Sequence, residues 1–142
     1  MRILGIDYGE RRIGIAVSDP LGLVAGGLET VQNRGNIEET AKAIKAIVDE
    51  YDIKKIVVGM PKNMNNTEGF RAEATYQFIA AVSKEIDGVE VITWDERLTT
   101  VIAGKTMNDM GVKRKDKKKN VDRIAAVLIL QAYLDRSDSA NS

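Results

Sequence analysis

The stretch Arg2–Ser18 reads RILGIDYGERRIGIAVS and carries the strongest fold signal in the chain. Two apolar, β-branched runs, Arg2–Asp7 and Arg12–Ser18, flank a short polar turn, which is typical of a β-hairpin. The first run ends in a carboxylate, Asp7, and Gly9 in the turn lets backbone or a ligand approach closely. Removing a carboxylate from water at the end of an apolar strand costs free energy unless a nearby cation compensates that cost. The hairpin therefore predicts both a sheet and a charged site at the end of its first strand.

Downstream of the hairpin, the hydrophobic pattern alternates between strand and helix periods. A third, weaker strand is expected over Leu23–Val31, which would complete a three-stranded meander. Asn36 precedes apolar residues at helical spacing and is placed as an N-cap, with Glu39 positioned for a capping box. The nearly continuous apolar run Ile53–Met60 suits a parallel strand covered on both faces. The remaining elements are expected to be a helix capped by Thr67, a strand at Val89–Trp94, and helices at about Thr99–Met110 and Val121–Leu134.

This order of elements predicts the fold. A meander extended by right-handed βαβ crossovers gives a mixed five-stranded sheet, a three-stranded antiparallel meander plus two parallel strands, flanked by helices. That α/β arrangement is the ribonuclease H-like architecture. The 142 residues fit one domain, expected over residues 1–136, with a frayed tail at 137–142.

Composition narrows the chemistry available to this domain. The chain has no His and no Cys, and 21 Lys and Arg balance 21 Asp and Glu. Histidine triads, disulfides and thiolate metal sites are therefore excluded, and a zinc site is disfavoured. Acid–base work falls to carboxylates, lysines, tyrosines or water activated by a metal. No apolar run approaches about 20 residues, and the N-terminus does not resemble a secretory signal, so we expect a cytoplasmic protein with no membrane partner.

Three acidic segments, far apart in the chain, carry the functional signal. Asp7 ends the first strand, Asp95 and Glu96 follow the last strand, and Asp122 stands at the start of the final apolar helix. Ligands of an open α/β sheet collect beyond the carboxyl ends of its strands, so these acids can face one cleft. Two Mg²⁺ or Mn²⁺ ions would neutralise them and serve phosphodiester hydrolysis. We therefore predict that all four residues are catalytic.

The predicted metal ligands within this set are Asp7, Glu96 and Asp122. Adjacent residues of a strand point to opposite faces, so Asp95 and Glu96 do not enter the cleft in the same way. Glu96 is favoured for its longer reach, which leaves Asp95 to orient Arg97 or to cap the following helix. Taken singly, each acid is better explained as a cap or an ion-pair partner. The metal site rests on all of these positions together.

Basic residues surround the predicted cleft. The run 113–119 supplies six of them in seven positions, directly before the helix that carries Asp122. Such a patch would dock a phosphate backbone, although a solvated charged loop explains the same run. Arg11 and Arg12 lie in the turn after Asp7, where solvated turn charges are an equal alternative. The full set of predicted nucleic-acid-binding residues is Arg11, Arg12, Lys62, Arg97, Lys113, Arg114, Lys115, Lys117, Lys118 and Lys119.

Four blocks of sequence, in order and across nearly the whole chain, resemble the YqgF/RuvX family. They are Asp7–Asp19, Gly59–Gly69, Asp95–Thr100 and Asp122–Leu134. The resemblance implies a bacterial ribonuclease H-like nuclease, related to Holliday junction resolvases and proposed to trim the 5′ end of pre-16S ribosomal RNA. The family's acidic site then falls on the four acids named above. Asn66 replaces a glycine common in the family's loop, which affects the turn there and leaves the acids untouched.

The sequence leaves four functions open. The first is a divalent-metal-dependent endonuclease acting on structured RNA, expected to mature pre-16S rRNA with ribosomal particles as a partner. The second is a Holliday junction resolvase acting on branched DNA, which requires a two-fold dimer; the sequence displays no clear dimer surface and favours a monomer or weak homodimer. The third is a non-catalytic, nucleic-acid-binding ribosome-assembly factor. The fourth is a phosphate binder of the actin-like ATPase type, because Gly5–Gly9 also resembles their first phosphate-binding hairpin, although this chain lacks their second half.

Overall fold

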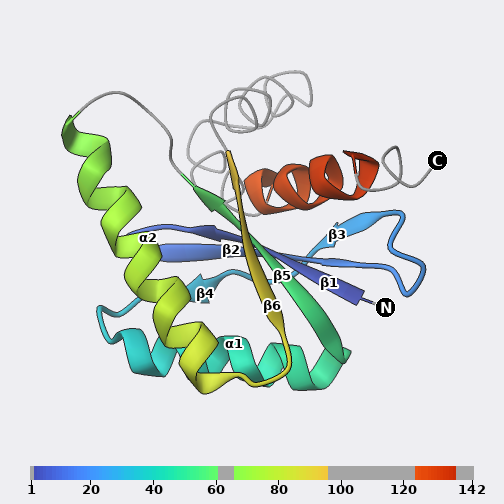
Figure 1. Cartoon of the computed structure of the whole chain (residues 1–142), viewed down its shortest axis with the longest axis horizontal. Coiled ribbons are helices and arrows are strands. Elements are labelled where there is room, and N and C mark those ends of the chain that lie inside the picture. The colour runs from blue at the N-terminus through green and yellow to red at the C-terminus, as the bar shows by residue number, and fades with distance from the viewer. Residues whose placement is uncertain (1, 61–65, 96–123, 137–142) are drawn as a thin grey trace.

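The computed structural model describes residues 2–60, 66–95 and 124–136. The elements in these ranges are β1 (Arg2–Tyr8), β2 (Arg12–Ser18), β3 (Ala25–Gly27), β4 (Val31–Gln32), α1 (Ile37–Tyr51), β5 (Ile53–Met60), α2 (Asn66–Glu85), β6 (Glu90–Asp95) and a C-terminal helix over residues 124–136. Together they form one sheet with helices on both faces (Figure 1). None of these helices is long and apolar enough to cross a membrane.

The sheet joins an antiparallel meander to two parallel strands. Its order is β3-β2-β1-β5-β6, and β4 also pairs with β2. β1 is antiparallel to β2 and parallel to β5, and β5 is parallel to β6. The predicted α/β class and mixed sheet are confirmed, with six strands in the described residues where five were expected. Because β1, β5 and β6 run in the same direction, their carboxyl ends lie at one edge of the sheet.

The predicted strand over Leu23–Val31 is wrong in its bounds, because two short strands replace it. Ala16 pairs with Gly27 in β3, whereas Ile13 pairs with Val31 in β4, so three steps along β2 match four steps on its partner. One extra residue between β3 and β4 is a bulge that divides the strand.

The start of that predicted strand belongs instead to a tight loop. The Asp19 carboxylate accepts hydrogen bonds from the backbone amides of Leu23 at 2.7 Å and Val24 at 3.0 Å. The Asp19 amide in turn donates to the Val24 carbonyl oxygen at 2.9 Å. These bonds hold residues 19–24 out of the ladder, and β3 begins only at Ala25.

Local signals place the helices within a residue or two. Asn36 caps α1 as predicted, since its side chain accepts from the amides of Glu38 and Glu39 at 3.1 and 3.2 Å. Helix α2 begins at Asn66, so the predicted cap at Thr67 is wrong and that residue lies inside the helix. Strand β6 is displaced by one residue from the prediction. The helix expected at about 99–110 lies outside the described residues.

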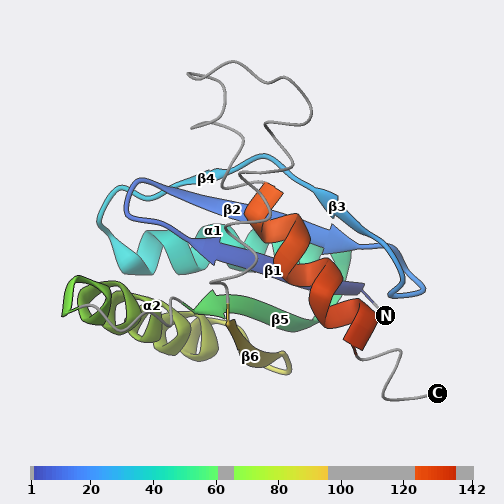
Figure 2. The same ribbon diagram turned by 90° about the horizontal axis from the view of Figure 1, so that it is seen from above.

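The helices cover both faces of the sheet (Figure 2), and an apolar cluster lies between the sheet and the helices on each face. One face of the sheet packs on α1 and α2 through a cluster that includes Leu4, Ile6, Ile44 and Phe78. In this layer the Tyr8 ring stacks on Phe78 with centroids 4.5 Å apart. The opposite face packs on the C-terminal helix. That second cluster contains Ile3, Ala16, Val57, Ala126, Ile129, Leu130 and Leu134.

Candidate active site at the carboxyl end of the sheet

Asp7 lies near the carboxyl end of β1, where the sequence placed it. It is half-buried and pairs with Gly14 of β2 on one side and Gly59 of β5 on the other. Side chains alternate between faces along a strand, and Ile3 of β1 belongs to the layer under the C-terminal helix. Asp7, four residues later, is therefore on the face that the C-terminal helix covers.

Glycines surround Asp7 on this face. Gly14 and Gly59 occupy its two cross-strand positions, and Gly5 precedes it by one full strand repeat. These three glycines have no side chains, so the strand positions around the Asp7 carboxylate are backbone alone; we call the three glycines the glycine floor. Glycine inside a strand often marks a site where another group approaches closely. Sequence reasoning missed the roles of Gly14 and Gly59, because only the strand register shows that both flank Asp7.

The end of β6 reaches the same edge. Trp94 pairs with Gly59, the residue that also pairs with Asp7, and Asp95 pairs with Met60. Neighbouring strands are about 4.8 Å apart, so the Asp7 and Trp94 backbones are separated by roughly 10 Å. The structure thus brings the first predicted acid and the backbone of the Asp95 position to one edge of the sheet. The other predicted acids, Glu96 and Asp122, lie outside the described residues.

The C-terminal helix begins close to Asp7. A Cβ atom built on Gly5 would stand 2.7 Å from the Leu130 Cβ and 3.1 Å from the Ala126 carbonyl oxygen. Gly5 therefore permits a close approach that any larger residue would prevent. Ala126 is fully buried at this contact, and its small side chain allows the helix to pack tightly on the sheet. Asp122 precedes residue 124, the first described residue of this helix, by two positions in the sequence.

A glutamine fixes the helix to the meander side of the sheet. The Gln131 side-chain oxygen accepts from the Ala25 amide at 2.9 Å, and its nitrogen donates to the Leu23 carbonyl oxygen at 2.9 Å. The amide side chain thus forms the two bonds that a neighbouring strand would form at the edge of β3. The same nitrogen also donates to Asp135 at 2.9 Å.

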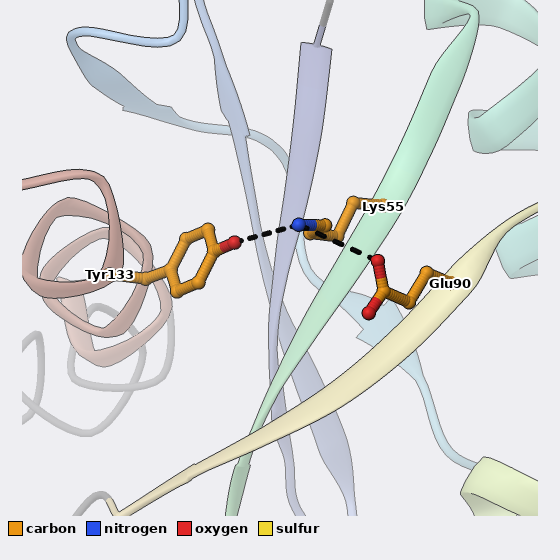
Figure 3. Close-up of polar contacts among 3 residues, drawn as sticks. All are labelled: Lys55, Glu90 and Tyr133. Atoms are coloured by element: carbon orange, nitrogen blue, oxygen red, sulfur yellow. Dashed lines mark hydrogen bonds and ion pairs between the residues drawn. The ribbon is translucent and has the colours of Figure 1, made fainter. Parts of the chain in front are cut away.

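A lysine fixes the helix to the parallel side. The Lys55 ammonium donates to the Tyr133 hydroxyl at 2.9 Å and lies 3.5 Å from the Glu90 carboxylate, as Figure 3 shows. The hydrogen bond to Tyr133, with Glu90 nearby, raises the pKa of Lys55 above its usual 10.5. Tyr133 also meets the Trp94 ring edge to face at 6.0 Å. The helix that follows Asp122 in the sequence is therefore held at both sides of the sheet.

The predicted basic residues of the first turn flank the site. Arg12 opens β2 and pairs with Gln32 of β4; it is half-buried and lies on the same face as Gly14 and Ala16 by strand alternation. Arg11 is exposed in the turn. The remaining predicted nucleic-acid-binding residues, Lys62, Arg97, Lys113, Arg114, Lys115, Lys117, Lys118 and Lys119, lie outside the described residues.

The donor chemistry at this edge fits a hard cation. Asp7 contributes a carboxylate, and the chain contains no His or Cys that would favour zinc. Oxygen donors are the ligands that Mg²⁺ and Mn²⁺ select. Within the described ranges no three potential metal-binding side chains converge, and the two other predicted ligands fall outside those ranges.

The fold places the chain in a structural class. Over 96% of both chains it is similar to Thermus thermophilus RuvC solved with a Holliday junction substrate, with a TM-score of 0.56 at 19% identity. It is also similar to the large terminase nuclease of thermophilic phage G20c, with a TM-score of 0.55 at 13% identity over 94% of this chain and 81% of that one. The chain therefore has the α/β fold of RuvC.

Sequence comparison then gives the family. The model of the RuvX family, described as Holliday junction resolvase, matches residues 1–136, and the chain belongs to that family. A relative from Acetivibrio thermocellus is 56% identical over 135 residues, covering 95% of this chain and 96% of the relative. One from Clostridium tetani is 50% identical over 135 residues with the same coverage. Both carry the provisional name pre-16S rRNA nuclease.

Proposed function

We propose that this protein is a divalent-metal-dependent endonuclease that cleaves structured nucleic acid and matures the 5′ end of pre-16S rRNA. The observation that carries the proposal is the position of Asp7, over a glycine floor and in register with the ends of β5 and β6. The names of relatives at 50–56% identity support the choice of substrate.

Three residues are proposed as metal ligands: Asp7, Glu96 and Asp122. Ile92 and Trp94 of β6 belong to the layer under the C-terminal helix, on the same face as Asp7. Glu96 continues their two-residue period in the sequence, whereas Asp95 does not. This alternation along the sequence favours Glu96 as the metal ligand and leaves Asp95 a supporting catalytic role.

The chemistry divides between the metal and the chain. When bound, Mg²⁺ or Mn²⁺ supplies Lewis-acid stabilisation of the charge that develops on the phosphoryl group. The acids hold the cation at the carboxyl edge of the sheet, and the glycine floor leaves room for the phosphate beside Asp7. The basic residues of the first turn and of the run 113–119 bind the flanking backbone. Without histidine in the chain, no imidazole takes part in proton transfer.

The test is cleavage of a labelled RNA that carries the 16S 5′ leader, with Mg²⁺ or Mn²⁺ present. Asp7→Asn keeps the shape of the side chain and removes the charge. Residues that only support a metal ligand typically cost up to about 100-fold when they are replaced. We expect the cleavage rate to fall by more than that, because Asp7 is a proposed ligand itself. Asp87→Asn is the matched control, because Asp87 is an exposed acid after α2, at the opposite end of the sheet. Equal cleavage by both variants would refute the site, and absence of cleavage by the wild type would favour an assembly factor.

A Holliday junction resolvase is the second candidate, favoured by the description of the RuvX family. Symmetric cutting of a four-way junction requires two aligned sites and hence a two-fold dimer. Offering the same variants a labelled DNA junction, together with sedimentation at the assay concentration, separates the two functions. Paired symmetric nicks from a dimer would establish resolution; RNA cleavage by a monomer would exclude it.

A further inference from the structure

A second loop lies against the turn that follows Asp7. β4 pairs with the start of β2, so the chain leaves β4 beside the β1–β2 turn (Figure 2). Asn33 bonds the loop to the turn. Its backbone N–H donates to the Arg11 carbonyl oxygen at 2.9 Å, and its side-chain nitrogen donates to the Gly9 carbonyl oxygen at 2.8 Å. The Asn33 side-chain oxygen also accepts from the Gly35 amide at 3.2 Å. The loop 33–36 and the turn 9–11 are therefore joined by hydrogen bonds, and we call these two segments together the ledge.

This ledge presents two arginine side chains, Arg11 and Arg34. Arg11 and Arg34 are both exposed, and the part of the chain that the structure describes gives neither guanidinium group a hydrogen bond or ion pair. Arg34 lines a hollow of about 180 Å³ with Gln32, Asn36, Glu39, Thr40 and Ala43. Glu39 shares that hollow without pairing with Arg34, so the guanidinium group is available to an external anion.

The ledge lies within reach of a polymer bound at Asp7. The backbones of Asp7 and of the ledge are two strand spacings apart across the sheet, about 10 Å, and three residues apart along β2, about another 10 Å. These two directions are perpendicular, so the backbones are separated by roughly 14 Å. Phosphates of one strand rise about 3.4 Å along a duplex axis and lie farther apart than that through space, so this distance corresponds to a few nucleotides. A nucleic-acid backbone bound at Asp7 would span this distance.

We propose that Arg34, together with Arg11, binds the phosphate backbone of the substrate a few nucleotides from the bond that is cleaved. The proposal rests on the proposed function for the identity of the polymer. It extends the interface across β2 toward α1. Since Glu10 and Glu38 are also exposed nearby, contact depends on the individual guanidinium groups rather than on a broad positive field. Arg34 is thus a binding residue that neither hydrophobic periodicity nor charge clustering indicated.

The experiment measures binding without cleavage, in the Asp7→Asn background, by fluorescence anisotropy of labelled leader RNA over a range of salt. Removing one phosphate contact lowers the slope of log affinity against log salt by about one. We expect that loss, with several-fold weaker binding, for Arg34→Ala. Arg34→Lys should retain most of the slope, and Glu39→Gln should strengthen binding by removing the adjacent negative charge. Lys84→Ala, an exposed cation in the last turn of α2, is the control and should match the parent.

A second measurement locates the contact. Single uncharged methylphosphonates are placed along the RNA, and the variant and parent are compared at each position. The effect of Arg34→Ala should disappear when the neutral linkage stands at one position a few nucleotides from the cleavage site. An unchanged slope for Arg34→Ala, or an effect that no linkage removes, overturns the proposal. If Arg34→Ala lowers the salt slope but the wild-type protein does not cleave the RNA, the proposed nuclease function is refuted and the ledge is still a nucleic-acid-binding surface.

Discussion

At the scale of single residues, Gly5 controls how closely the C-terminal helix approaches the strand that carries Asp7. Gly5→Ala would place a methyl group 2.7 Å from the Leu130 Cβ, an overlap that backbone must move to relieve. Overpacking of this kind costs about 1–3 kcal/mol, so we expect the free energy of unfolding in urea to fall by that amount. Activity should fall as well, because the helix that follows Asp122 is displaced.

The control for this substitution is another strand glycine. At Gly26 a new Cβ would meet nothing closer than the Val17 carbonyl oxygen at 4.0 Å, which is ordinary contact. Gly26→Ala should therefore change the free energy of unfolding by less than about 0.5 kcal/mol. Equal effects at the two glycines would show that chain entropy, rather than the contact with the helix, sets the response.

Asp19 gives the loop 19–24 a pH dependence with a defined sign. Hydrogen bonds from the amides of Val24 and Leu23 hold the pKa of Asp19 below its usual 3.8. A carboxyl group with a lowered folded pKa stabilises the protein above its unfolded pKa, and this contribution disappears as the pH falls through the lower folded value. We expect wild type to be more stable than Asp19→Asn at pH values of about 5 to 7. The difference should vanish below the folded pKa, as measured by urea unfolding across this range; a difference that grew on acidification would contradict the assignment.

At the scale of elements, the C-terminal helix is held by one polar side chain on each side of the sheet, Gln131 and Tyr133. Tyr133→Phe removes the hydroxyl that accepts from Lys55 at 2.9 Å and keeps the ring that packs on Trp94. A single lost hydrogen bond is worth about 0.5–1.5 kcal/mol, and we expect that decrease in thermal or urea unfolding. The Lys55→Met variant, which removes the ammonium and the ion pair with Glu90 as well, should lose at least as much. A neutral result for Tyr133→Phe would mean that packing alone holds the helix.

The elements also show how far the sequence alone could go. Asn36 and the apolar run Ile53–Met60 were located correctly, because an N-cap and a continuous buried strand are local signals. The start of the third strand is not predictable in the same way, because β3 begins where the side chain of Gln131, 106 residues further along the chain, accepts from the Ala25 amide. Long-range contacts of this kind leave no periodic trace.

The candidate site divides in the same way. Asp7 was predictable, because a carboxylate that ends an apolar strand is visible in the sequence. Gly14 and Gly59 were not, because their place beside Asp7 depends on strand register. The role proposed for Arg34 is not visible in the sequence for a related reason: the pairing of β4 with β2 and the side chain of Asn33 bring its loop to the turn that follows Asp7.

At the scale of the whole molecule, the two ends of the sheet differ in role. The carboxyl ends of the parallel strands carry Asp7 and the ledge formed by the turn 9–11 and the loop 33–36. The opposite end carries the loop 19–24, which exposes Leu21 and Val24. Substitutions at that opposite end therefore test folding without disturbing the proposed cleft, which is why Asp87 and Lys84 serve as controls.

This division allows metal binding to be measured through the stability of the whole protein, independently of cleavage. A ligand that binds only the folded state stabilises it by RT ln(1 + [L]/Kd), about 2.7 kcal/mol at a hundred times Kd. Titration with Mn²⁺ should raise the melting temperature of wild type and of Asp87→Asn by the same amount, and have much less effect on Asp7→Asn. Ca²⁺, which accepts the same oxygen donors, should also stabilise wild type. An equal shift in all three proteins would place the bound cation away from Asp7, and no shift in any of them would remove the support for a metal centre.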